Sequence, residues 1–142
     1  MAAARSFQLP KSDTAWRIAL WMLQVLLAVA FGMAGRAKAL TPLPELAKSL
    51  AFTADVPGWL VRFIGWAELA GAAGLILPAL TRIWPKLTPL AAAALALIMV
   101  LAIAFHLLRG EAAMIGGPIV LLVLAAFVAW ARMTKAPIAP RP

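Results

Sequence analysis

The chain has 142 residues, of which 65% are hydrophobic and 13% are charged, a composition that excludes an ordinary soluble domain and indicates a membrane protein. The absence of cysteine excludes disulfides, iron–sulfur clusters and thiolate metal sites, and the single histidine cannot supply both axial ligands of a haem, so we expect no metal and no covalently bound cofactor. The formal net charge of +8 comes from basic residues that lie between apolar runs, which favours anionic lipid headgroups over nucleic acid as partners.

Four apolar runs are separated by charged or proline-rich breaks, and each approaches the roughly 20 residues that an α-helix needs to cross a bilayer. The runs lack the alternating pattern of a membrane barrel, and the backbone inside lipid must satisfy its own hydrogen bonds. The sequence therefore predicts an all-α fold, a single membrane domain with four transmembrane helices in a bundle, over about 16–40, 58–80, 89–108 and 112–132. The segments 1–12 and 134–142 are expected to be flexible tails.

A shorter helix is predicted between the first two spans, over about residues 43–53. Its apolar residues follow the i, i+3, i+4, i+7 spacing of one helical face, and the segment is too short to cross a membrane. Two interpretations stay open. The segment is either an interfacial or re-entrant helix that covers the bundle as a lid, or a surface helix that only joins two spans.

Local signals predict how the later spans begin. Thr88 is expected to be the N-cap of the third span, with Pro89 at the first helical position, and Asp55 is expected to cap the second span. Gly116 and Gly117 before Pro118 predict a break or kink in the opening turns of the fourth span.

Lysine and arginine residues predict how the bundle lies in the membrane. Eight of the 13 fall on the side of the N-terminus, the 81–88 loop and the C-terminus, namely Arg5, Lys11, Arg17, Arg82, Lys86, Arg132, Lys135 and Arg141. Because cytoplasmic segments carry more of these residues, we predict a multi-pass membrane protein with both termini in the cytoplasm.

Glu68 is a carboxylate inside an apolar run, ten residues, or roughly 15 Å, from the predicted outer end of the second span. A charged side chain that faces lipid costs about 2.5–3.5 kcal/mol, so Glu68 should face the bundle interior. Gly65, Gly71 and Ala72 share its face and would let another helix approach closely, while Trp66 points elsewhere, towards lipid.

Two roles for Glu68 are open. In the structural one it is protonated or paired with Lys38 or Arg62 and joins helices; in the functional one, which we favour, it lines a cavity that binds a ligand or passes a proton. Lys38 and His106 are predicted at a similar depth, and a carboxylate and an imidazole in one dry cavity can exchange a proton. The alternatives are that Lys38 snorkels to headgroups and that His106 is an interface residue. Secondary candidates are Gln24, Arg62 and Trp66.

The stretches "GWAELAGAAGLILP", "LTPLAA" and "FHLLRGE", in this order and spacing, resemble DoxX-like proteins, small four-helix bacterial membrane proteins, over about residues 17–132. The resemblance implies a four-helix bundle in the cytoplasmic membrane, and some members look like membrane partners of thiosulfate:quinone or thiol-stress oxidoreductase systems. Carried onto this chain, the helix-two acid of the family falls on Glu68, its helix-one "GxxK" on Gly35 and Lys38, and its helix-three histidine on His106. This chain has no cysteine, which argues against direct thiol chemistry by the chain itself.

From these features we predict an auxiliary membrane subunit of a quinone- or thiol-linked redox system, more an oxidoreductase-associated subunit than a stand-alone enzyme. Its bundle would bind a quinone or a similar lipophilic small molecule through Glu68, His106 and Lys38. The expected partners are the lipid bilayer, a soluble oxidoreductase and a second copy of the chain. Two alternatives are a proton-coupled transporter or exporter of lipophilic compounds, which would require a dimer, and a membrane isomerase with Glu68 and His106 as acid and base.

Overall fold

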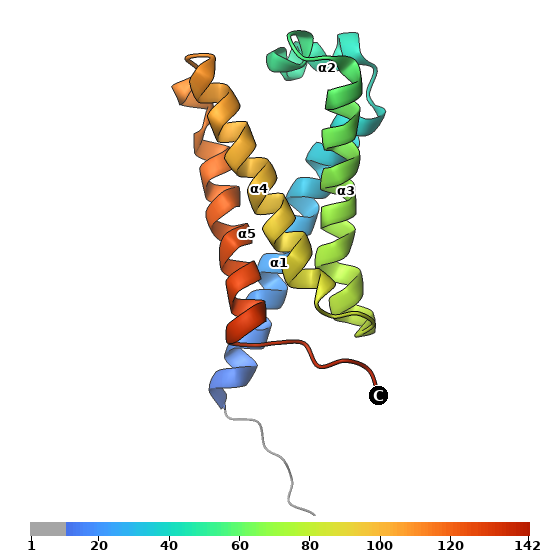
Figure 1. Ribbon diagram of the computed structural model, residues 1–142, viewed down its shortest axis with the longest axis vertical. Helices are drawn as coiled ribbons and strands as arrows, with labels where there is room; N and C mark the ends of the chain where they lie inside the picture. Colours follow the sequence, from blue (N-terminus) through green and yellow to red (C-terminus); the bar gives the residue numbers. More distant parts are fainter. Residues whose placement is uncertain (1–10) are drawn as a thin grey trace, which may run out of the picture.

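Four long helices form the bundle in the computed structural model, which describes residues 11–142 (Figure 1). They are α1 (Lys11–Leu40), α3 (Gly58–Thr81), α4 (Leu87–Leu108) and α5 (Gly116–Thr134). All four are long and apolar enough to cross a membrane, and residues 11–142 contain no strand. The predicted all-α fold with four membrane-spanning helices is therefore confirmed, and the chain is a multi-pass membrane protein.

Three short helical elements connect the long helices: α2 (Leu43–Ser49), the 3₁₀ turn η1 (Ala51–Ala54) and the 3₁₀ turn η2 (Ala112–Met114). The predicted short helix between the first two spans fits α2 and η1. In Figure 1, α2 lies at the end of the bundle opposite the C-terminus, and the turn between α4 and α5 lies at that same end. We call this the α2 end, and the opposite end, which holds the start of α1, the α3–α4 turn and Pro142, the terminal end.

The starts of two helices differ from the predictions. The first residues of α4 are Leu87 and Thr88, whose amides bond to carbonyls of the preceding turn, so Thr88 lies inside the helix and is buried. The expectation that Thr88 is the N-cap is wrong, because the α3–α4 turn, with positive φ at Arg82 (61°) and Trp84 (47°), already brings the chain into the helix before Thr88. Pro89 still occupies the first turn, where its missing N–H removes no helical hydrogen bond.

Asp55 does not cap α3 either. The N-cap position is Pro57, no side chain caps this helix, and the Asp55 carboxylate instead accepts a hydrogen bond from Arg109. At the fourth span, η2 ends at Met114 and α5 begins at Gly116, so the helix is interrupted at Ile115, just before the glycines, and Gly116 and Gly117 are the first residues of α5.

The core runs through the centre of the bundle and consists mainly of leucine and alanine side chains. Its fully buried members include Leu20, Leu27, Leu75, Leu95 and Val128, drawn from all four long helices. Large apolar side chains also cover the outside of the helices, as expected where the surrounding solvent is lipid. Trp66 is one of these exposed side chains.

The segment after α5 lies against the terminal end of the bundle. Arg82 of the α3–α4 turn donates hydrogen bonds to the carbonyl oxygens of Ala139 (3.1 Å) and Pro140 (3.0 Å), and the Arg141 amide donates to the Arg82 carbonyl (3.0 Å). The flexibility of this tail stays a prediction. Arg5 and the rest of the predicted N-terminal tail up to residue 10 lie outside the described residues.

Candidate functional site

Lys38 and Glu68 meet between α1 and α3. The ammonium nitrogen of Lys38 lies 2.7 Å from both carboxylate oxygens of Glu68, and the two side chains are 13% and 1% exposed. Lys38 therefore turns inward and does not snorkel to headgroups. The pairing is the one that the structural interpretation of Glu68 requires, while a ligand role for Glu68 stays a prediction.

Two glycines bring these side chains within reach of each other. A methyl group added to Gly65 would lie 2.5 Å from the backbone nitrogen of Ala39, and one added to Gly35 would lie 2.7 Å from the Gly65 carbonyl oxygen. On each helix the charged residue follows its glycine by three positions, so glycine and charge share one face. The close backbone crossing at the glycines thus sets the distance between the charges one turn away.

Neighbouring residues tighten the packing around this crossing. Arg62 donates a hydrogen bond of 2.7 Å to the Lys38 carbonyl, which joins the start of α3 to the end of α1. Gly71 seats the Leu95 side chain of α4, because a methyl group there would lie 2.5 Å from Leu95 Cδ2. Ala72 is buried beside it. Glu68 therefore lies on a face of α3 that packs against both α1 and α4.

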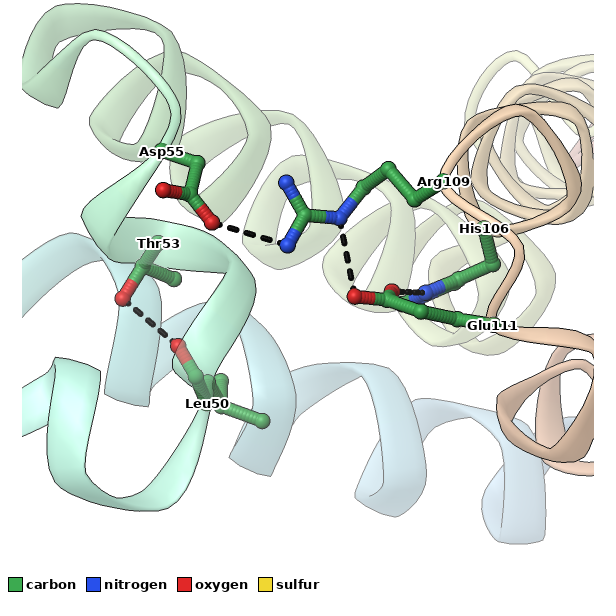
Figure 2. A network of polar contacts seen from close by, with 6 residues as sticks. All are labelled: Leu50, Thr53, Asp55, His106, Arg109 and Glu111. Carbon is green, nitrogen blue, oxygen red and sulfur yellow. Dashed lines mark hydrogen bonds and ion pairs between the residues drawn. The ribbon is translucent and has the colours of Figure 1, made fainter.

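His106 has a different partner from the one predicted. Its Nδ1 lies 2.7 Å from Glu111 Oε2, and Arg109 links Glu111 (Nε to Oε1, 2.9 Å) to Asp55 (Nη2 to Oδ2, 2.8 Å). Figure 2 shows these four side chains, which we call the loop cluster, joining η1 and the α4–α5 turn. Among the described residues, no hydrogen bond or ion pair links His106 to Glu68 or Lys38.

Aromatic rings surround the imidazole. The His106 ring, whose side chain is 12% exposed, lies 5.8 Å from both Phe52 and Phe105, edge to face in each case, and Phe52 lies 5.9 Å from Phe105. The Arg109 guanidinium lies over the Phe105 ring at 5.4 Å. Phe52 and Asp55 thus connect the η1 segment to the end of α4, while the role of this segment as a lid stays a prediction.

Acidic and basic side chains of the loop cluster pair with one another. Hydrogen bonds from His106 and Arg109 lower the pKa of the Glu111 carboxyl, and hydrogen bonds to Asp55 and Glu111 raise the pKa of Arg109. Glu111 is therefore charged at neutral pH, and so is Arg109. The carboxylate holds the imidazole in one orientation and favours the tautomer with a proton on Nδ1.

We expect the loop cluster to lose its contribution to stability in acid. A carboxyl whose pKa is lowered by folding stabilises the fold above its ordinary pKa, about 4.3, and this stabilisation disappears as the pH falls through the lowered value. At pH values below about 4, the midpoint temperature of thermal unfolding should therefore decrease more steeply with falling pH for the wild type than for Glu111→Gln. Glu45→Gln is the matched control, because Glu45 is exposed in α2 and forms no ion pair within residues 11–142. Parallel curves for the wild type and Glu111→Gln would contradict the prediction.

A second buried polar group lies deeper in the bundle. The Gln24 amide donates a hydrogen bond of 2.6 Å to the Leu75 carbonyl and accepts one of 2.6 Å from Arg132 Nε. Arg132 is only 4% exposed, although its position at a helix end predicts a flanking basic residue. One signal could have revealed its burial: Ala125, Val128 and Arg132 follow the i, i+3, i+7 spacing of the buried face of α5.

Metal binding finds no support in the part of the chain that the structure describes, where no three His, Asp or Glu residues lie close enough together to hold an ion. The side chains described above can form hydrogen bonds and ion pairs and can exchange protons.

Comparison with known proteins identifies a family match. The model of the DoxX-like family matches residues 22–128, a range that includes Gly35, Lys38, Glu68, His106 and Glu111. No curated protein and no solved structure gives a significant match. Since the matched residues make up well over half of the chain and contain all four membrane-spanning helices in whole or in large part, the protein belongs to the DoxX-like family.

Proposed function

We propose that the protein is an auxiliary membrane subunit of a redox system, and that it binds a quinone or a similar lipophilic ring compound where the α2–η1 segment meets His106. The observation that carries the proposal is the imidazole of His106, held by Glu111 at 2.7 Å and flanked by the rings of Phe52 and Phe105. We further propose that this end of the bundle faces away from the cytoplasm of a bacterial inner membrane.

The loop cluster and the neighbouring rings offer both the polar and the apolar contacts that can recognise a quinone. With Nδ1 bonded to Glu111, the other ring nitrogen, Nε2, is the one left to meet a ligand. A protonated Nε2 can donate to a quinone carbonyl, and a neutral one can accept from a quinol hydroxyl. The phenylalanine rings provide apolar faces against which a flat ring can stack.

In this proposal the chain supplies binding and proton exchange, and electrons pass between the quinone and a partner oxidoreductase. This division of labour agrees with the resemblance to membrane partners of oxidoreductases, and with a sequence that has no cysteine for thiol chemistry. Lys38 and Glu68 join α1 to α3, and their direct contact with the ligand is a separate proposal that the same experiment tests.

We expect decylubiquinone to bind the detergent-solubilised protein and His106→Phe to weaken its binding about two- to tenfold, because a hydrogen bond typically contributes about 0.5–1.5 kcal/mol net. Phenylalanine keeps the ring volume and removes both nitrogens. Glu111→Gln should weaken binding as well, since the imidazole loses the carboxylate that fixes its tautomer. Quenching of tryptophan fluorescence by the quinone gives the dissociation constant.

Two controls separate the candidate sites. Trp66→Phe changes an exposed aromatic side chain on α3 and should leave the dissociation constant unchanged. Loss of binding in Glu68→Gln, with normal binding in His106→Phe, would place the ligand at the Lys38–Glu68 pair and overturn the assignment to the loop cluster. Absence of quinone binding by the wild type would overturn the quinone proposal itself.

A further inference from the structure

A groove of about 980 Å³ opens at the terminal end of the bundle, far along α4 from the loop cluster. It lies between the α3–α4 turn, the first turns of α4, the end of α5 and the tail that follows it. Ten of its twelve lining residues are apolar, and the other two, Lys86 and Arg132, are cationic. The groove thus combines an apolar wall with positive charge alone.

Arg132 carries a buried charge that lacks a counter-ion. Its Nε donates to Gln24 and its Nη1 donates to the Ala136 carbonyl (3.2 Å), while its guanidinium lies 5.9 Å from the ring of Trp21. All these partners are neutral. None of the ion pairs among the described residues includes Arg132, and burying a cation without an anion is costly.

The chain's own acids cannot fill this role. Glu68, Asp55 and Glu111 are engaged in the ion pairs described above, and Glu45 lies in α2 at the other end. Asp13 remains, but it lies eleven residues before Gln24 on α1, about 16 Å along the helix axis. The nearby charge of Arg17 adds to the positive potential at Arg132.

The same region also holds unsatisfied polar atoms. Among the described residues, two buried side-chain atoms lack a hydrogen-bond partner, and they are Arg132 Nη2 and Thr88 Oγ1. Thr88 is fully buried and is absent from the groove lining, whereas Arg132 lines the groove, so Arg132 Nη2 is the orphaned atom that belongs to it. Orphaned buried donors are rare in folded proteins, and a bound acceptor is one explanation for such a group.

We propose that this groove binds an acidic phospholipid of the adjoining membrane leaflet, with its phosphate against Arg132 and Lys86 and an acyl chain along the apolar wall formed by Leu87, Leu90 and Met133. The groove is far larger than a free phosphate requires, and it lies at the ends of membrane-spanning helices, where headgroups are found. Phosphate oxygens match the planar donor set of a guanidinium. Because Nη2 is itself covered, the exposed Lys86 meets the phosphate first, and contact with Nη2 requires the groove to open further.

The test is native mass spectrometry of the delipidated full-length protein, titrated with phosphatidylglycerol or phosphatidylcholine of the same acyl chains. We expect wild type to retain phosphatidylglycerol preferentially, and Lys86→Gln to reduce this preference about fivefold, as expected for the removal of one cation near an anionic headgroup. Arg132→Gln should reduce it at least as much. Lys135→Gln is the matched control, because Lys135 lies at the same end, contacts Trp130 and is absent from the groove lining.

Because Arg132 is buried, Arg132→Gln could fail through misfolding, and a second variant avoids this. Ala93→Trp fills the groove from the exposed side of α4 and leaves the Gln24–Arg132 bonds intact, so it should also abolish the preference for phosphatidylglycerol. Equal retention of the two lipids by wild type, or an unchanged preference in both Ala93→Trp and Lys86→Gln, would overturn the proposal. Displacement of the lipid by millimolar inorganic phosphate would overturn it too, since the ligand would then be a small anion.

Discussion

Replacement of Glu68 by leucine is expected to destabilise the folded bundle by about 3 kcal/mol or more, the cost of leaving one partner of a buried ion pair without the other. Lys38 Nζ lies 2.7 Å from both Glu68 oxygens, and no other carboxylate pairs with it among the described residues. In Glu68→Leu the ammonium group must remain unpaired between α1 and α3 or pull away to the surface, and either change weakens the contact between the two helices.

The double variant distinguishes two explanations for this loss of stability, the unpaired charge of Lys38 and the lost packing of the Glu68 side chain. Lys38→Met/Glu68→Leu removes both charges and keeps similar side-chain volumes, so it should recover most of the stability, because an apolar pair can replace a buried ion pair at little cost. Reversible unfolding in mixed micelles with increasing dodecyl sulfate gives the four free energies of the cycle. The pair Asp55–Arg109 is the control, since both side chains are partly exposed and a surface ion pair contributes little. If the double variant is as unstable as Glu68→Leu, the loss comes from packing at Glu68 and not from the orphaned charge.

The sequence predicts the membrane-spanning architecture well, because crossing a bilayer requires a length of apolar residues that can be counted along the chain. It also predicts that Glu68 faces inward, because the cost of exposing a carboxylate to lipid is large. Lys38 is identified as a possible partner from depth alone. The choice between Lys38 and Arg62 depends on side-chain direction at the glycine crossing, which requires three-dimensional packing.

The sequence-based predictions fail for residues whose contacts depend on a turn of the chain or on the direction of a side chain. Glu111 comes five residues after His106, and the positive φ of Gly110 (72°) turns the chain so that its carboxylate returns to the imidazole. A comparison of depths along straight helices cannot anticipate this return. The burial of Arg132 escapes for a related reason: a basic residue at a helix end has the typical position of a headgroup contact, while its guanidinium actually reaches inward to Gln24.

Gly65→Ala is expected to separate α1 from α3 and to cost about 1–3 kcal/mol, the usual range for overpacking a tightly packed site. The added methyl group would lie 2.5 Å from the Ala39 nitrogen, 2.8 Å from the Lys38 carbonyl carbon and 2.9 Å from the Gly35 carbonyl oxygen. All three are backbone atoms of α1, so no side-chain rotation can relieve the overlap and the whole helix must move. Gly32→Ala is the matched control. Gly32 lies on α1 one turn before Gly35, and no atom lies within 4 Å of the added carbon.

The control should be neutral or slightly stabilising, since alanine favours a helix over glycine by up to about 1 kcal/mol. The displacement caused by Gly65→Ala should also lengthen the Lys38–Glu68 contact, because Lys38 is among the residues pushed away. In the Lys38→Met/Glu68→Leu background this second loss is no longer possible, and the cost of Gly65→Ala should shrink towards the overpacking term alone. Equal stability of Gly65→Ala and Gly32→Ala would contradict the prediction. It would mean that α1 and α3 lie too far apart for the Lys38 ammonium group and the Glu68 carboxylate to be in contact at 2.7 Å.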